Sequence, residues 1–79
     1  MLKLKIVSPE KVVYDGDTES VVVPGMLGKF EILSNHAPII SSLTEGVVEY
    51  TNSEGKQSVS IKGGFVEVKK NEVCVCVEI

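Results

Sequence analysis

The chain has 79 residues, of which 43% are hydrophobic and 24% are charged, and its formal net charge is −3 at pH 7. This length predicts a single domain, residues 1–79, near the small end of what folds without disulfides or a metal. The apolar content excludes a disordered tail, and no apolar run approaches the ~20 residues of a membrane helix. The negative net charge and the scattered positions of the basic residues argue against a surface that binds nucleic acid.

The first residues alternate between apolar and charged side chains. Leu2, Leu4 and Ile6 alternate with Lys3 and Lys5, which places the aliphatic side chains on one face of a β-strand. The same alternation lacks the apolar core of a signal peptide, so we do not expect secretion.

The rest of the chain consists of short β-branched runs separated by turn residues. The runs lie at residues 12–14, 20–23, 47–50, 59–61 and 73–77. The predicted turns are Ser8-Pro9, Asp15-Gly16, Pro24-Gly25, residues 52–55, Gly63-Gly64 and Lys70-Asn71. No window shows helical spacing of apolar residues. Roughly nine or ten short strands at this spacing predict a β-sandwich or a barrel.

Two of these strands, residues 21–23 and 73–77, are apolar on both faces. One face of an antiparallel sheet normally meets water, so such a strand indicates a partner protein on its outer side. The alternative is a strand that passes from one sheet to the other at a corner.

The only histidine, His36, precedes Ala37-Pro38. A single imidazole excludes a histidine-based triad or a histidine-rich metal site within the chain. We interpret His36 as a turn residue that hydrogen-bonds locally.

Three acidic residues, Asp15, Asp17 and Glu19, alternate like the start of a calcium loop. An EF-hand would need a glycine at Ser20 and an acid at Leu27, and the chain offers neither. We therefore interpret the acidic segment as a solvated hairpin tip.

The two cysteines, Cys74 and Cys76, lie on one strand face. Two thiolates cannot complete a tetrahedral zinc site, and only His36 could join them. A disulfide between positions i and i+2 of a flat strand is near the upper distance limit. We interpret both as free, small, buried apolar residues that suit a reducing, cytoplasmic setting.

The sequence contains no group of residues whose types and spacing match a catalytic or phosphate-binding site. The segment Gly25–Lys29 lacks the spacing and the Ser/Thr of a phosphate-binding loop, and no nucleophile–base pair can be assembled. We expect no catalytic, cofactor-binding or metal-binding residue, no small-molecule substrate and no enzymatic activity.

The segment from Val23 to Pro38 is the most specific motif. Pro24-Gly25 predicts one turn, Phe30 and Ile32 alternate along a short strand, and Asn35 to Pro38 closes it. The run G-K-F-E-I-L-S-N-H-A-P resembles a signature of the N-terminal domain of the epsilon subunit of F-type ATP synthase. Further blocks resemble that family in the same order: Ile6–Glu10, Tyr14–Gly16, Gly46–Val48, Gly63–Val68 and Asn71–Val73.

The resemblance implies an all-β, ten-stranded sandwich of two sheets. It also implies a non-catalytic central-stalk (rotor) subunit that links the gamma subunit to the c-ring, so that proton-driven rotation is coupled to ATP synthesis. Such a subunit is peripheral, on the cytoplasmic face of the bacterial inner membrane.

The family's contacts are carried over onto this chain residue by residue. The c-ring contact would involve Lys29, Phe30 and Glu31. The gamma contact would involve Ser8, His36 and Ser41. Many members carry an acid where this chain has Lys29 and a small residue where it has Glu31, so the c-ring contact is expected to be re-sited along the strand.

The family usually continues into a two-helix C-terminal domain, whereas this sequence ends at Ile79. We expect that these residues neither inhibit ATP hydrolysis through an extended helix nor bind nucleotide. The alternative function is a free-standing β-sandwich adaptor that binds an unrelated protein or a carbohydrate. The absence of tryptophan argues against a carbohydrate site, because such sites usually contain exposed aromatic side chains.

Overall fold

A computed structural model describes residues 1–79 and contains nine β-strands and no helix. The strands are β1 (Leu2–Val7), β2 (Val12–Thr18), β3 (Ser20–Gly25), β4 (Gly28–Ile32), β5 (His36–Leu43), β6 (Gly46–Asn52), β7 (Gly55–Ile61), β8 (Gly63–Lys70) and β9 (Glu72–Glu78). The predicted all-β class is confirmed, with nine strands rather than the ten that the resemblance implied. No helix in the structure is long and apolar enough to cross a membrane.

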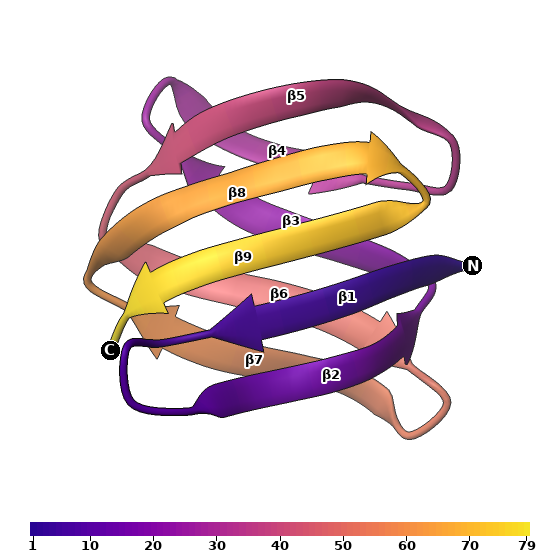
Figure 1. The fold of residues 1–79 in the computed structure, drawn as a ribbon, viewed down its shortest axis with the longest axis horizontal. Coiled ribbons are helices and arrows are strands. Elements are labelled where there is room, and N and C mark those ends of the chain that lie inside the picture. The colour runs from indigo at the N-terminus through magenta and orange to yellow at the C-terminus, as the bar shows by residue number, and fades with distance from the viewer.

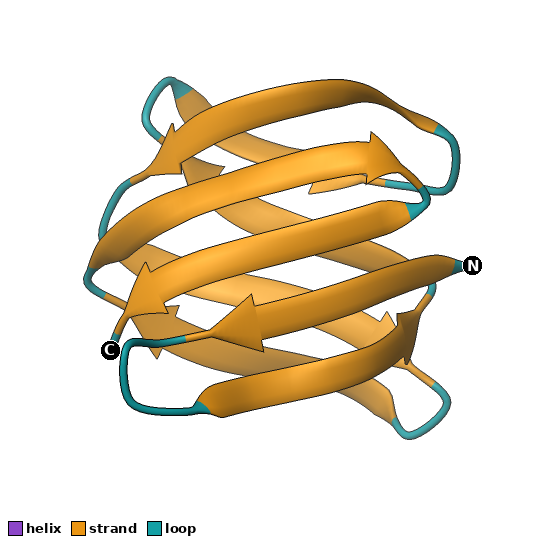
Figure 2. Cartoon of the chain, in the orientation of Figure 1, coloured by secondary structure: helices purple, strands orange, loops and turns teal.

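The strands form two layers that face each other (Figure 1). One layer, called here the front layer, contains β2, β1, β9, β8 and β5, and the other contains β4, β3, β6 and β7. A single backbone pairing, Gly25 with Leu43, joins β3 to β5 and makes the hydrogen-bonded network continuous. Neighbouring strands are antiparallel except for β1 and β9, which are parallel. The loops lie at the two ends of the sandwich (Figure 2).

The core lies between the layers and contains 15 buried hydrophobic residues. Leu2, Leu4 and Ile6 of β1 are all among them, so the predicted alternation is confirmed. Beside β1, the side of the sandwich is closed by Tyr14 of β2 and Tyr50 of β6, whose ring centroids lie 4.4 Å apart. Such an aromatic pair adds about 0.5–1.5 kcal/mol beyond the area that it buries.

The two strands that are apolar on both faces differ in their surroundings. Val21 and Val23 of β3 are buried and Val22 is half-buried. β3 lies between β4 and β6 in one layer and pairs with β5 of the opposite layer only through Gly25 and Leu43, so only its end lies at a corner. In β9 the valines are buried, whereas Cys74 and Cys76 are half-buried on the outer face.

Three predicted turns are wrong in position, and one of them, Gly63-Gly64, is the start of β8. Asp15 and Gly16 lie inside β2 and not at a hairpin tip, because β2 continues alongside β1 and pairs Asp15 with Lys5. Opposite charges facing each other across two strands contribute about 0.2–1 kcal/mol. Pro24-Gly25 closes β3, and the reversal itself is Met26-Leu27, between the paired glycines Gly25 and Gly28.

The turn before β5 is also displaced from its predicted position. Ser34 and Asn35 form the turn, and Asn35 adopts φ 63°, which asparagine tolerates better than most residues. The strand then begins at His36, and its register shifts between His36 and Ile39. This irregularity accommodates Pro38, which cannot donate a hydrogen bond within a regular ladder.

Candidate interaction surfaces

The β3–β4 hairpin ends in an exposed apolar tip. Met26 is 65% exposed and Leu27 is 106% exposed, although two-residue turns usually carry Gly, Asn or Asp. The Met26 N–H donates to the carbonyl of Ser42 at 3.1 Å, and the Thr44 N–H donates to the carbonyl of Pro24 at 2.9 Å. The tip is therefore held against the end of β5 while its two side chains face solvent.

The residues predicted to meet the c-ring follow directly on this tip. Lys29 and Glu31 are exposed, Phe30 is half-buried against the core, and Ile32 is buried. The expected alternation along β4 is therefore present: one face of the strand anchors it, and the other presents a cation and an anion.

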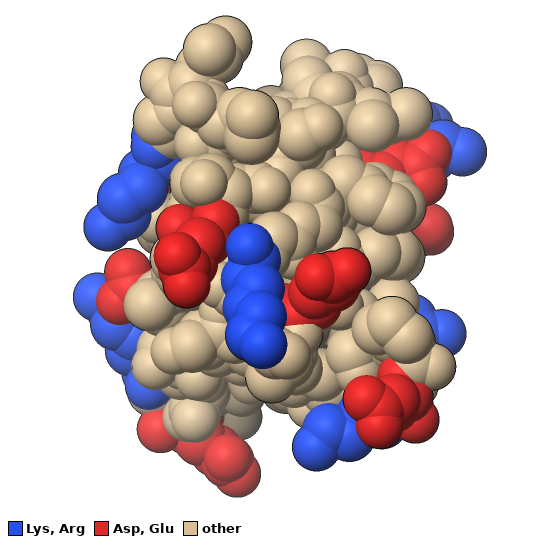
Figure 3. All heavy atoms as spheres, turned by 90° about the vertical axis from the view of Figure 1, so that its left-hand side faces the viewer, with Lys and Arg blue, Asp and Glu red and all other residues tan.

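Figure 3 shows the end of the sandwich at which the β3–β4 tip lies. Uncharged atoms occupy most of the upper part of this view, which contains the tip, and charged side chains gather below and at the sides. The tip is thus part of a largely uncharged surface rather than an isolated apolar projection.

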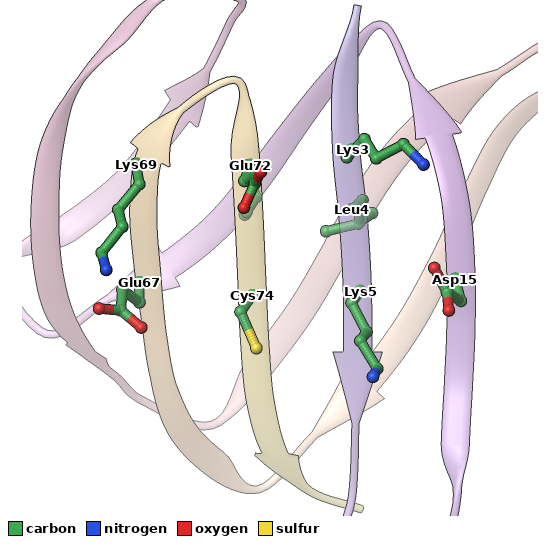
Figure 4. Close-up of a pocket in the computed structure, with 9 residues that line it drawn as sticks. Lys3, Leu4, Lys5, Asp15, Glu67, Lys69, Glu72 and Cys74 are labelled. Atoms are coloured by element: carbon green, nitrogen blue, oxygen red, sulfur yellow. The ribbon is translucent and has the colours of Figure 1, made fainter.

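The outer face of the front layer has a charged half. A depression of about 400 Å³ lies there, lined by Lys3, Leu4, Lys5, Asp15, Glu67, Lys69, Glu72, Val73 and Cys74. In Figure 4 these side chains rise from four neighbouring strands, and cations stand beside anions. The alternation leaves no strong single-sign field that would attract nucleic acid or an acidic ligand.

The other half of this outer face is apolar. A second depression, of about 380 Å³, lies between the β1–β2 turn and the adjoining ends of β8 and β9. Phe65, which is 47% exposed, is paired with Cys76, and Cys76 in turn is paired with Val7 of β1. Ser8 and Pro9 form the rim.

The structure does not bring the three predicted gamma-contact residues together. Ser8 borders the apolar half, next to Phe65. His36 is paired with Lys70 at the far end of β8, about 17 Å away along the strand. Ser41 is paired with the buried Val66, so its side chain lies on the inward side of β5.

His36 makes the local hydrogen bond that we predicted, but it does so as the first residue of β5 and not as a turn residue. It is half-buried, and its Nδ1 lies 2.7 Å from the carbonyl oxygen of Ala37. Because a carbonyl only accepts, this hydrogen bond requires the proton on Nδ1.

The cysteines are not the buried apolar residues that we predicted. Both are half-buried on the outer face, because β9 directs its valines to the core and leaves the alternate positions outside. Burial raises the pKa of the Cys74 thiol, and the neighbouring Cys76 raises it further, whereas Lys5 lowers it. At neutral pH Cys74 is a thiol with a cation close by.

Sequence reasoning missed Met26, Leu27 and Phe65 as surface residues. A signal for the first two was present, because the motif Gly25-Met26-Leu27-Gly28 places large apolar residues between two glycines that favour a turn. No such signal existed for Phe65, whose exposure depends on which face of β8 covers the core.

The structure thus defines a small β-sandwich whose most prominent surface features are apolar, which is typical of a protein-interaction domain. No three His, Cys, Asp or Glu side chains gather into a metal site. The family described as ATP synthase, Delta/Epsilon chain, beta-sandwich domain matches residues 1–79, and the chain belongs to this family. The resemblance found in the sequence is confirmed.

Several relatives carry the name ATP synthase epsilon chain. The protein from Leptospira borgpetersenii is 46% identical over 74 residues, which are 94% of this chain and 58% of the relative. The protein from Gloeothece citriformis is 38% identical over 76 residues, 96% of this chain and 55% of the relative. The chain therefore spans just over half the length of these relatives.

Two solved structures share the fold. One is a chain of the Euglena gracilis mitochondrial ATP synthase, determined as OSCP/F1/c-ring, with a TM-score of 0.89 and 19% identity over 96% of this chain and 49% of that chain. The other belongs to the Tetrahymena thermophila mitochondrial ATP synthase central stalk and c-ring, with a TM-score of 0.83 and 14% identity over 99% of this chain and 63% of that chain. At these identities the likeness supports the fold alone.

Proposed function

We propose that this chain serves as a non-catalytic rotor subunit in the central stalk of an F-type ATP synthase. In that role it links the gamma subunit to the c-ring, so that proton-driven rotation is coupled to ATP synthesis. The observation that carries the proposal is the match of the epsilon-family sandwich to the whole of residues 1–79. The subunit would be peripheral, on the cytoplasmic face of the bacterial inner membrane.

The c-ring contact is proposed for the β3–β4 hairpin. Its support is the apolar tip Met26-Leu27, followed by the exposed charges Lys29 and Glu31. Phe30 packs against the core behind them and would keep the strand in place under load. Two backbone hydrogen bonds to the β5 end give the hairpin the rigidity that transmission of torque requires.

The gamma contact is proposed for the outer face of the front layer. Its support is the apolar depression beside Ser8 and the exposed ring of Phe65, which would be buried by a partner. For His36 also to take part, gamma would have to extend along the outer face to β5, whereas the Ser41 side chain lies on the inward side of that strand.

Co-purification tests this function most directly. We expect a tagged chain to retain gamma and c subunits from a membrane extract. A Met26→Glu/Leu27→Glu variant is expected to keep gamma and to lose the c-ring, because two charges would replace the apolar tip. Retention of one unrelated protein by the unmodified chain would point to the adaptor alternative and would refute the rotor assignment.

A second variant separates the hairpin charges from its fold. Exchanging the charges in Lys29→Glu/Glu31→Lys is expected to weaken ring assembly with little change in thermal stability, since exposed ion pairs contribute only about 0–1 kcal/mol. The matched control is Glu54→Lys/Lys56→Glu at the β6–β7 turn, where both residues are also exposed. A loss of stability confined to the β4 variant would mean that these charges maintain the fold.

A further inference from the structure

Cys74 and Cys76 form a pair of thiols on the outer face of the front layer. They occupy alternate positions of β9, so both side chains project from the same side of the strand. Figure 4 shows the sulfur of Cys74 directed along β9 toward the end of the strand where Cys76 lies. Both residues are half-buried and can be reached from solvent.

The spacing of the two positions suits a bridging atom better than a direct bond. Alternate residues of a strand lie about 6.6 Å apart, which is close to the ~6.8 Å upper limit between the Cα atoms of a disulfide. Two bonds of about the length of a zinc–sulfur bond, ~2.3 Å, would separate the sulfurs by about 4.6 Å when placed end to end. Thiols that lean toward each other from these positions meet that separation without a change in the backbone.

The neighbours of the pair determine how many ligands it offers. Cys74 lies between Lys5 and Glu67, and Cys76 lies between Val7 and Phe65. No three potential metal-ligating side chains converge in this protein. The pair therefore presents two sulfur ligands, which is too few for tetrahedral zinc.

Two thiolates with no further ligand favour a soft monovalent cation, because soft sulfur ligands select Cu(I) among the first-row metals. Binding would release both thiol protons and leave a bis-thiolate copper unit with one net negative charge. The ammonium group of Lys5, on the strand next to Cys74, supplies the countercharge. Phe65 and Val7 flank the other sulfur and reduce its contact with water.

We propose that Cys74 and Cys76 form a two-coordinate site for a thiophilic monovalent cation, of which Cu(I) is the physiological representative. This site does not rest on the rotor function, although Cys76 also lines the apolar depression of the proposed gamma contact. It lies on the same outer face as the proposed gamma contact, so we expect it to be open in the free chain.

The test is titration of the reduced chain with Cu(I) under anaerobic conditions, in competition with a chromogenic chelator. We expect one copper per chain, with two sulfur scatterers in X-ray absorption. Cys74→Ser and Cys76→Ser are each expected to weaken binding at least a hundredfold. Undiminished binding by either variant, one copper per two chains, or three or more sulfur scatterers would overturn the proposal.

A matched control keeps two thiols on the same strand face but moves them apart. In Cys76→Ser/Glu78→Cys the second thiol sits at an exposed position, about 13 Å from Cys74, and binding is expected to fall as far as in the single variants. Circular dichroism checks that each variant is folded. Equal copper affinity in this double variant would show that any two exposed thiols suffice and would refute a site built by the strand spacing.

Discussion

Gly64 is the residue at which backbone geometry leaves least freedom. It adopts φ 148°, and a Cβ atom there would collide with the backbone carbonyl oxygen of Cys76. The obstacle is backbone of the paired strand β9 and cannot rotate away. We predict that Gly64→Ala destabilises the protein by more than about 4 kcal/mol, which is exceptional for a single substitution, as measured by urea unfolding.

Gly55 provides the matched control for this substitution. It also has a positive φ, 106°, but no atom lies within 4 Å of its would-be Cβ. Gly55→Ala should therefore cost only the strain of the conformation, about 1–3 kcal/mol. Equal losses at the two positions would show that the collision with β9 is relieved by movement of the strand.

Tyr50 gives the stability a dependence on alkaline pH. Burial raises the pKa of its hydroxyl above the ordinary value of 10.0, and the neighbouring Tyr14 raises it further. Between the unfolded and folded pKa values the unfolded chain has lost this proton while the folded chain retains it. This contribution is fully present below pH 10.0 and is lost as the pH rises through the folded pKa.

We therefore predict that the free energy of unfolding of the wild type falls more steeply above pH 10 than that of Tyr50→Phe. A single proton accounts for at most about 1.4 kcal/mol per pH unit. Urea titrations at several pH values between about 9 and 11 measure the difference. Parallel curves for the two proteins would contradict the prediction.

Among the elements, two turns at one end of the sandwich are joined by asparagines. The Asn35 N–H donates to Oδ1 of Asn71 at 2.6 Å, and Asn71 Nδ2 donates to Oδ1 of Asn35 at 3.4 Å. The carbonyl of Asn71 also accepts from the Lys3 N–H at 2.7 Å. The β4–β5 and β8–β9 turns are thereby tied to each other and to the start of β1.

Asn71→Ala is predicted to destabilise the protein by about 0.5–1.5 kcal/mol, because the exposed Asn35 N–H loses its protein acceptor. Asn35→Gly is the control: it preserves that N–H and relieves the positive φ of 63° at the turn, so its effect should be near zero. Thermal unfolding of both variants is the measurement. A loss of stability in Asn71→Ala alone would assign the effect to the hydrogen bond of the Asn71 side chain, whereas equal losses would mean that any substitution in these turns is destabilising.

The elements also show how far a sequence can be interpreted alone. β1 was predictable because its period of two is uninterrupted, and the epsilon-type segment was predictable from its motif. The prediction of a turn at Asp15-Gly16 was wrong because turn propensity depends only on residues that are close in the sequence. It does not include the pairing with β1, which keeps β2 extended. The exposure of Cys74 was missed for a similar reason: an apolar run does not reveal which alternate positions face the core.

The surface pairings were the least predictable part of the candidate sites. Ser8, His36 and Ser41 were grouped by resemblance, yet their positions depend on the register of β5 with β8 and on the β1–β2 turn. Those pairings join segments that are distant in the sequence, so the residues next to each position do not predict them. The exposure of Lys29 and Glu31 was predicted correctly. It depends only on the alternation of exposed and buried side chains within the single strand β4.

At the scale of the whole molecule, the exposed apolar surfaces predict self-association of the isolated chain. The β3–β4 tip and Phe65 leave large side chains in water, and burial of apolar area gains about 25 cal/mol per Å². We expect weak, concentration-dependent association in sedimentation velocity experiments at high protein concentration. Met26→Ser/Leu27→Ser should reduce it, and a strictly monomeric wild type would contradict the prediction.

The parallel pairing of β1 with β9 has a consequence for the way the chain folds. Lys3 of β1 is aligned with Glu72 of β9, so the centre of the front layer cannot form until segments from opposite ends of the sequence meet. Closing a loop of this length costs roughly 4 kcal/mol of chain entropy before the pairing stabilises anything. We therefore expect folding in milliseconds to seconds, as for other proteins dominated by distant contacts. During synthesis on the ribosome, β1 can pair with β2 early. It cannot pair with β9 until residues up to about Cys76 have left the exit tunnel.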